Sequence, residues 1–83
     1  MSDNTKLNVL QFYTIPEGDW EALYVNGELQ VEGHKVRVEE VAQFTPIESV
    51  GLKYIENFDE DYFPDRVEDF PNHWRITSYY DWY

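Results

Sequence analysis

The side chains that could do chemistry in this chain are mainly carboxylates, and many of them are crowded into one short stretch. Residues 56–69 read ENFDEDYFPDRVED and contain seven acidic residues and one arginine. The acidic residues of this stretch, which we call the acidic segment, are Glu56, Asp59, Glu60, Asp61, Asp65, Glu68 and Asp69. Carboxylates at such close spacing can bind a cation, act as an acid–base pair or attract a basic protein.

The spacing of these residues does not favour a metal site or an enzyme. Asp59, Asp61 and Asp65 match positions 1, 3 and 7 of a calcium-binding loop. Pro64, however, stands where the sharp turn of that loop needs glycine, and Phe70 stands where it needs a bidentate glutamate. The chain has no cysteine, 2 histidines, and neither a serine-hydrolase motif nor a glycine-rich phosphate loop. We therefore expect no enzymatic activity, no metal and no cofactor.

Charge limits the kinds of partner that the chain can have. Its 17 acidic and 6 basic residues give a net charge of −11, beyond the magnitude of roughly 2 to 8 that is usual for a soluble small domain. Seven acids and one arginine give the acidic segment −6, which leaves −5 for the other 69 residues. Repulsion between like charges disfavours direct binding to nucleic acid or to an anionic membrane. We expect a basic protein as partner, and the chain itself to be a monomer or a homodimer.

Large rings are interleaved with the carboxylates of the acidic segment. Phe58, Tyr62, Phe63 and Phe70 are poor residues for a mobile loop, so we expect them to anchor the segment on the core and fix its carboxylates in place. Alternate residues of a strand lie about 6.6 Å apart, and i,i+4 residues of a helix about 5 to 6 Å. Both spacings are close to two phosphate steps of about 3.4 Å along a nucleic-acid strand. Tyr62 is also expected to contact the partner, because tyrosine is enriched in binding hot spots.

These features predict a small inhibitor that mimics the charge of nucleic acid. It would occupy the basic surface of an enzyme or factor that binds DNA or RNA. Small acidic anti-defence proteins of phages, which block restriction or CRISPR systems, have the same general composition, but no motif ties the chain to them. One alternative is an immunity or antitoxin protein that neutralises a basic toxin. Another is an accessory domain whose acidity only confers solubility.

The clearest structural element in the sequence is a β-hairpin. Asn26-Gly27 separates two alternating runs, as in a type I′ turn. With a two-residue turn, Glu21 faces Glu32 across the hairpin. The face expected to join the core holds Trp20, Ala22, Tyr24, Leu29 and Val31. The opposite face carries a second acidic cluster, formed by Glu21, Glu28 and Glu32.

The rest of the chain is predicted to alternate short strands with one or two short helices. Strands are expected at residues 7–14, 49–58 and 74–83, which are rich in β-branched and aromatic residues. Residues 38–44 favour a short helix, although their first residues also suit a strand. Asp65 is expected to cap a single turn, with Glu68 completing a capping box.

The whole chain is predicted to be one α+β domain that spans residues 6–83 and follows a disordered N-terminus, residues 1–5. We expect an antiparallel sheet of four to five strands with one or two short helices. The first ten residues do not resemble a signal peptide, and no apolar run approaches the roughly 20 residues that span a bilayer. The expected location is the cytoplasm, or the host cytoplasm if a phage encodes the protein.

Overall fold

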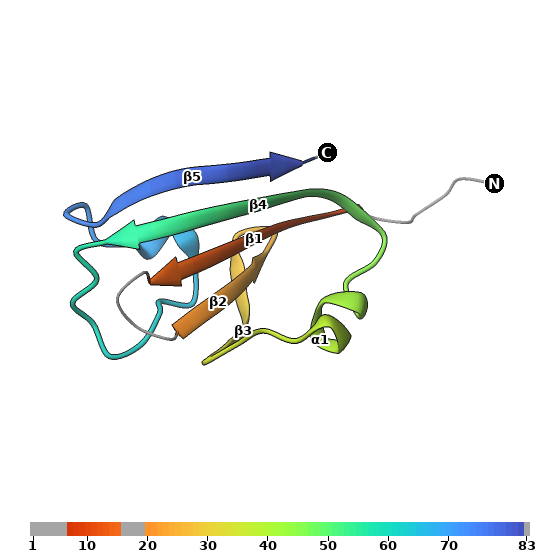
Figure 1. Ribbon diagram of the computed structural model, residues 1–83, viewed down its shortest axis with the longest axis horizontal. Coiled ribbons are helices and arrows are strands. Elements are labelled where there is room, and N and C mark those ends of the chain that lie inside the picture. Colours follow the sequence, from red (N-terminus) through yellow and green to blue (C-terminus); the bar gives the residue numbers. More distant parts are fainter. Residues whose placement is uncertain (1–6, 16–19, 83) are drawn as a thin grey trace.

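Five strands form a single sheet in the computed structural model, which describes residues 7–15 and 20–82, with side chains as far as residue 78. The predicted disordered stretch, residues 1–5, lies outside the described residues. The strands are β1 (Asn8–Ile15), β2 (Trp20–Val25), β3 (Glu28–Gly33), β4 (Ile47–Glu56) and β5 (Arg75–Trp82). Their order across the sheet is β3-β2-β1-β4-β5 (Figure 1).

The sheet is mixed, so the prediction of an antiparallel sheet is wrong. The central strand β1 runs parallel to β4, while the other neighbouring pairs are antiparallel. After β3 the chain forms the helix α1 (Val38–Ala42) and returns to the sheet on the far side of β1. Such a crossover is the usual way to join strands into a parallel pair. The coarser prediction of a small α+β domain is confirmed, with five strands, one α-helix and the 3-10 helix η1 (Val67–Asp69) among the described residues.

The hairpin turn is confirmed, but the pairing changes two residues beyond it. Asn26 has φ 54° and Gly27 φ 86°, the positive values that a type I′ turn requires at both positions. Val25 faces Glu28 and Tyr24 faces Leu29, as predicted.

Farther along β3, Gln30 is left without a partner in β2, so that Val31 faces Leu23 and Glu32 faces Ala22. The predicted pair of Glu21 with Glu32 is therefore wrong, because a β-bulge adds one residue to β3 and exchanges the faces of all residues after it. Val31 consequently lies on the opposite face from Leu29.

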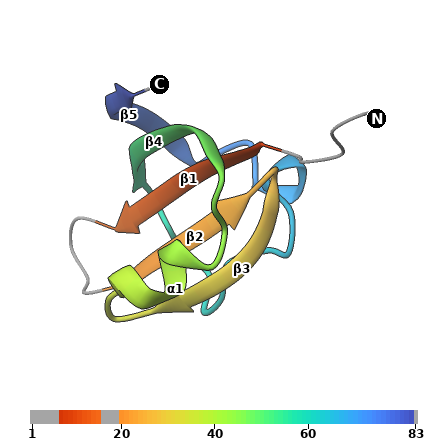
Figure 2. The ribbon, with the colours of Figure 1, turned by 90° about the vertical axis from the view of Figure 1, so that its right-hand side faces the viewer.

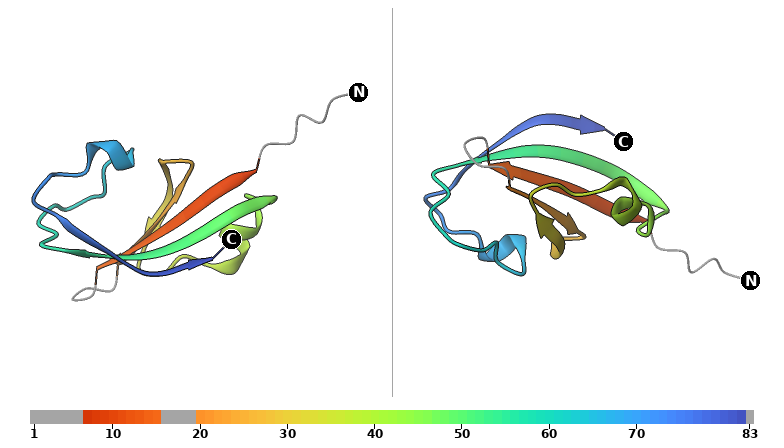
Figure 3. Two further views of the ribbon diagram at one scale, coloured as in Figure 1. Left: turned by 90° about the horizontal axis from the view of Figure 1, so that it is seen from above. Right: turned by 60° about the horizontal axis from the view of Figure 1, so that its bottom comes forward.

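Both faces of the sheet are covered, and each has its own hydrophobic cluster. One cluster has the buried residues Tyr13, Ala22, Tyr24, Ile55, Phe63 and Trp74. The other has Leu10, Leu23 and Val25, with Val31, Val41 and Phe44 packed against them. Figure 2 shows α1 lying over β2 and β3, and Figure 3 shows the segment that contains η1 on the other side of the sheet. The domain thus has three layers, with the acidic segment in one outer layer.

The two short helices differ in how closely they follow the sequence-based expectation. Helix α1 lies within the predicted range of residues 38–44, and the backbone N–H of Arg37 donates to Glu40 Oε1 at 2.8 Å. The predicted cap of η1 is wrong, because the turn starts after Arg66 and has no side-chain cap. Within the described part of the chain, neither helix is long enough to cross a membrane.

Candidate protein-binding surface

Buried rings fix the acidic segment to the sheet. Phe63 is 4% exposed, and Trp74, at the end of the following turn, is 6% exposed. The ring of Phe58 lies 5.0 Å from that of Phe63 and 4.8 Å from that of Trp74, centroid to centroid. Phe70 contacts Trp74 at 5.1 Å and Tyr24, on the sheet, at 5.3 Å. The prediction that rings anchor this segment is confirmed for Phe58, Phe63 and Phe70.

Backbone hydrogen bonds attach the second half of the acidic segment to the hairpin. The N–H of Leu29 donates to the carbonyl of Asp65 at 2.7 Å, and the N–H of Val67 donates to the carbonyl of Gly27 at 3.0 Å. Arg66 forms a single antiparallel bridge with Glu28. This pairing holds Arg66 extended (φ −133°, ψ 146°) and occupies the main chain of Asp65. Pairing with the hairpin therefore replaces the local cap that the sequence suggested.

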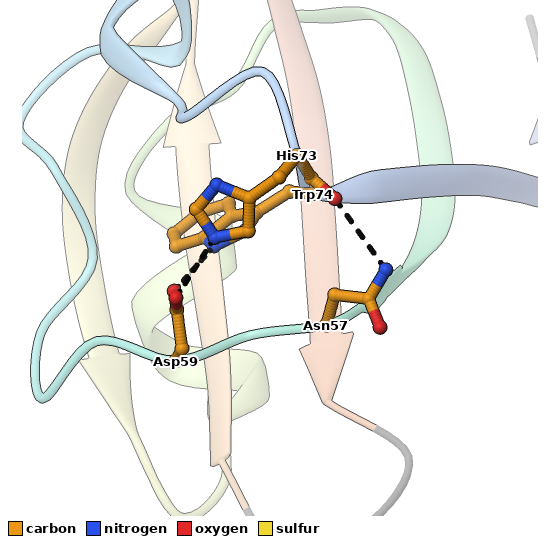
Figure 4. Close-up of polar contacts among 4 residues, drawn as sticks. All are labelled: Asn57, Asp59, His73 and Trp74. Atoms are coloured by element: carbon orange, nitrogen blue, oxygen red, sulfur yellow. Dashed lines mark hydrogen bonds and ion pairs between the residues drawn. The ribbon is translucent and has the colours of Figure 1, made fainter.

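Polar contacts hold the first half of the segment, as Figure 4 shows. Asn57 has φ 68°, a left-handed conformation that asparagine tolerates, and it turns the chain away from β4. The side chain of Trp74 donates from Nε1 to Asp59 Oδ1 at 3.1 Å, and His73 Nε2 lies 2.9 Å from Asp59 Oδ2. Asn57 Nδ2 also donates to the carbonyl of His73 at 3.4 Å. The hydrogen bonds from Trp74 and His73 lower the pKa of the Asp59 carboxyl below its ordinary value.

All seven carboxylates of the acidic segment are exposed, although the segment itself is anchored. Asp59 is the one among them that is tied to the turn before β5, through His73 and Trp74. No described residue forms a hydrogen bond or ion pair with the side chains of Glu60 and Asp61. Tyr62 follows them and is 74% exposed, so it does not anchor the segment. Glu60, Asp61 and Tyr62 form an exposed tip between the partly buried ring of Phe58 and the buried ring of Phe63.

The cation of the acidic segment is Arg66, and it neutralises the segment only weakly. Its guanidinium lies 3.5 Å from Glu28 Oε2 and 3.8 Å from Glu68 Oε2, and all three side chains are more than half exposed. Exposed ion pairs of this kind contribute at most about 1 kcal/mol. The contact does bring Glu28 of the hairpin to the acidic segment.

The second predicted cluster is therefore divided in the structure. Glu28 adjoins the acidic segment through Arg66. Glu32 lies on the face of the sheet that the acidic segment covers and accepts a hydrogen bond from Trp20 Nε1 at 3.0 Å. Glu21 points to the opposite face, where Oε1 accepts from the N–H of Val36 at 3.0 Å. Glu21 and Glu32 thus support local structure, and the bulge at Gln30 is the reason that they do not face each other.

The backbone that carries the carboxylates is anchored, but the carboxylates do not form the regular row that a strand or helix would give. Glu56 ends β4, residues 57–66 are irregular apart from the bridge at Arg66, and Glu68 and Asp69 lie in η1. In the described ranges, no three acidic or histidine side chains come together as possible metal ligands. Asp59, Asp61 and Asp65 accordingly do not converge on a common point.

Sequence reasoning missed the part that the turn before β5 plays in this surface. His73 and Trp74 lie outside the acidic segment, yet they bind Asp59. A signal was present, since a tryptophan close to an apolar core needs an acceptor for its indole N–H. Comparisons with protein-family models, with curated proteins and with solved structures gave no match. Function must therefore be argued from this surface itself.

Proposed function

We propose that the protein is a small inhibitor that uses the acidic segment to occupy the basic surface of a nucleic-acid-binding protein. The observation that carries this proposal is the contrast between buried rings and exposed carboxylates in the same 14 residues. A segment that served solubility alone would not need Phe58 and Phe63 packed in the core. Because the backbone of the segment is already anchored, little backbone entropy is lost on binding, which favours affinity for a matching set of cations.

Electrostatics supports the choice of partner class. A net charge of −6 over residues 56–69 steers a basic protein toward this surface and repels nucleic acid and anionic lipid. Glu60 and Asp61 can each accept charge-assisted hydrogen bonds from lysine or arginine. Tyr62, exposed between two anchors, offers the kind of aromatic contact that contributes strongly to protein interfaces.

The irregular spacing of the carboxylates favours a second candidate function. A general mimic of nucleic acid would place charges at regular intervals, as phosphates are placed. In this protein the charges instead come from the end of a strand (Glu56), from the irregular tip and from the 3-10 helix η1. An uneven pattern of this type suits one particular basic protein, as in an immunity or antitoxin protein. The two candidate functions differ in the surface of the partner that is covered. A nucleic-acid mimic covers the partner's nucleic-acid site, whereas an immunity or antitoxin protein need not.

Capture from a cell lysate at low salt, followed by competition, tests the proposal. The wild-type protein is compared with the double variant Glu60→Gln/Asp61→Asn. This variant removes two carboxylates that form no hydrogen bond or ion pair with the described residues. Asp59 stays unchanged because it holds the turn at Trp74. Glu39→Gln/Glu48→Gln is the matched control, since it removes two exposed carboxylates outside the acidic segment and leaves the same net charge of −9, that is −11 + 2.

The captured protein is then purified and offered its own nucleic-acid ligand in competition. The proposal predicts a nucleic-acid-binding partner that is lost with the tip variant, kept with the control and displaced by the oligonucleotide. A partner lost with the tip variant but indifferent to oligonucleotide would support the immunity-type function. Equal capture by all three proteins would contradict both.

A further inference from the structure

The turn between β2 and β3 contains a pair of residues, Asn26-Gly27, that can react without an enzyme. In spontaneous deamidation, the main-chain nitrogen of the next residue attacks the side-chain amide carbon of an asparagine. Glycine favours this attack, because it has no side chain to shield its nitrogen. Asn26 is followed by glycine, whereas the other asparagines are followed by threonine, valine, phenylalanine or histidine. The sequence thus makes Asn26 the most reactive asparagine of the chain.

Water can reach this turn. Asn26 is exposed. Apart from the two chain neighbours of Gly27, no atom lies within 4 Å of the place where a Cβ of this residue would stand. Solvent can therefore take the proton from the attacking nitrogen and can later hydrolyse the product of the attack.

The folded turn nevertheless opposes the reaction. Asn26 Oδ1 accepts a hydrogen bond from the N–H of Val9 at 3.0 Å, and Asn26 Nδ2 donates to Asn8 Oδ1 at 2.9 Å. Both polar atoms of the side chain are thus bound to β1. A type I′ turn, with ψ of about 30° at its first central residue, also keeps Cβ of that residue and the next nitrogen on nearly opposite sides of the Cα–C bond. A five-membered ring needs them on the same side, so the turn must open before the ring can close.

The same turn holds the acidic segment. The carbonyl of Gly27 accepts from the N–H of Val67 at 3.0 Å, and the N–H of Leu29 donates to the carbonyl of Asp65 at 2.7 Å. Glu28, between them, forms the bridge with Arg66. A change in the path of the main chain after Asn26 would therefore displace the groups that bind the acidic segment.

We propose that Asn26 is a site of spontaneous deamidation that the folded turn protects, and that its isoaspartate product releases the acidic segment from the hairpin. The nitrogen of Gly27 loses its proton to solvent and forms a bond with Cγ of Asn26. The bond from Cγ to Nδ2 breaks, and Nδ2 takes up protons from water and leaves as ammonia. The product of this step is a succinimide ring.

Water opens the ring at either of its two carbonyl carbons. Addition at Cγ gives aspartate, with the main chain restored. Addition at the main-chain carbonyl carbon of residue 26 gives isoaspartate, in which the main chain passes through Cβ and Cγ and is one atom longer. A two-residue turn cannot absorb this extra atom, because its geometry is fixed by the two strands that it joins.

Peptide mapping by mass spectrometry follows the conversion of Asn26 with time in mildly alkaline buffer, for the folded protein and for the protein in urea. Conversion should be at least about tenfold faster in urea, because the ring closes only after the turn has opened. The other asparagines in the same sample are an internal control and should convert more slowly than Asn26 in urea. Equal rates in the two states, or no conversion of Asn26 in urea, would overturn the proposal.

Two substitutions of Asn8 test the protection without changing the reacting pair. Asn8→Ala removes the acceptor for Asn26 Nδ2, whereas Asn8→Asp keeps a carboxylate oxygen there. Both lose the hydrogen bond from Asn8 Nδ2 to the carbonyl of Phe44, at 2.6 Å, so that this loss is matched. In the folded protein, Asn8→Ala should speed the conversion about threefold or more, and Asn8→Asp should not. An equal increase in both variants would contradict protection by the side-chain bond.

Ion exchange separates the products from the intact protein, because conversion adds a negative charge. Hydrogen exchange then compares the isoaspartate form with the intact protein and with Asn26→Asp, which adds the same charge and leaves the main chain unchanged. The amides of Leu29 and Val67 should exchange faster in the isoaspartate form alone, while those of β4 keep their protection. Unchanged exchange at Val67, or equal acceleration in Asn26→Asp, would contradict the release of the acidic segment.

Discussion

Truncation of Phe63 should destabilise the protein far more than truncation of its neighbour Tyr62. Phe63 is 4% exposed and its ring contacts those of Tyr24, Phe58, Phe70 and Trp74, whereas Tyr62 is 74% exposed. Removing a buried phenylalanine ring costs about 3 to 5 kcal/mol, while exposed substitutions usually change stability by about 0.5 kcal/mol or less. A domain of 83 residues has a total stability of about 4 to 12 kcal/mol. Phe63→Ala should therefore remove a quarter of it or more.

Urea and thermal unfolding, followed by circular dichroism, measure both variants under the same conditions. At about 4 to 8 °C per kcal/mol for a domain of this size, Phe63→Ala should lower the thermal midpoint by about 12 °C or more. Tyr62→Ala should leave it nearly unchanged, although the two substitutions remove rings of similar size. A cost below about 1 kcal/mol for Phe63→Ala would refute the idea that buried rings hold the acidic segment in place.

Three further results are expected. Gly27→Ala should destabilise the hairpin by about 1 to 2 kcal/mol in urea unfolding, because φ 86° is unfavourable for alanine; an unchanged midpoint would contradict the type I′ turn. Arg66→Gln should tighten binding of the basic partner in titration calorimetry, since it removes the cation of the acidic segment, and weaker binding would count against charge attraction. Because the pKa of Asp59 is lowered in the folded state, its contribution to stability is present above the ordinary value of 3.8 and is lost as pH falls through the folded value. The gap in thermal midpoint between wild type and Asp59→Asn should therefore close at acid pH, and a constant gap would contradict this role.

Local signals in the sequence predicted the elements better than their pairing. Asn26-Gly27 specified the turn, because few residues tolerate positive φ at two consecutive positions. The bulge at Gln30 had no such signal, since glutamine fits a regular strand equally well. One extra residue then moved Val31 and Glu32 to faces opposite to those predicted. Register depends on the packing of the whole sheet and could not be read from the hairpin alone.

The parallel pair of β1 and β4 was missed although the sequence contained signs of it. A helix was predicted between the third and fourth strands, and a helix between strands is typical of a parallel crossover. β1 also has apolar residues at both alternating positions, such as Leu10, Phe12 and Tyr13. That pattern indicates a strand that is buried on both faces. The prediction of an antiparallel sheet did not take that pattern into account.

For the candidate surface, composition predicted the anchoring residues more reliably than it predicted the contacts between particular residues. Phe58 and Phe63 pack as expected, because large rings among charges have no other favourable place. The contacts of Asp59 with His73 and Trp74 join residues 14 and 15 positions apart. Their meeting depends on the left-handed turn at Asn57 and on the path of the chain across the sheet. No local pattern in the sequence specifies that path.

The most direct test of the central claim is the salt dependence of partner binding. The dissociation constant of the purified partner is measured by calorimetry at a series of salt concentrations, for the wild type and for Glu60→Gln/Asp61→Asn. If anchored carboxylates bind a basic surface, affinity should fall steeply with salt, and the variant should bind more weakly with a shallower dependence. A dissociation constant that barely changes with salt, or an equally steep dependence in the variant, would contradict the claim that the acidic segment is the binding surface.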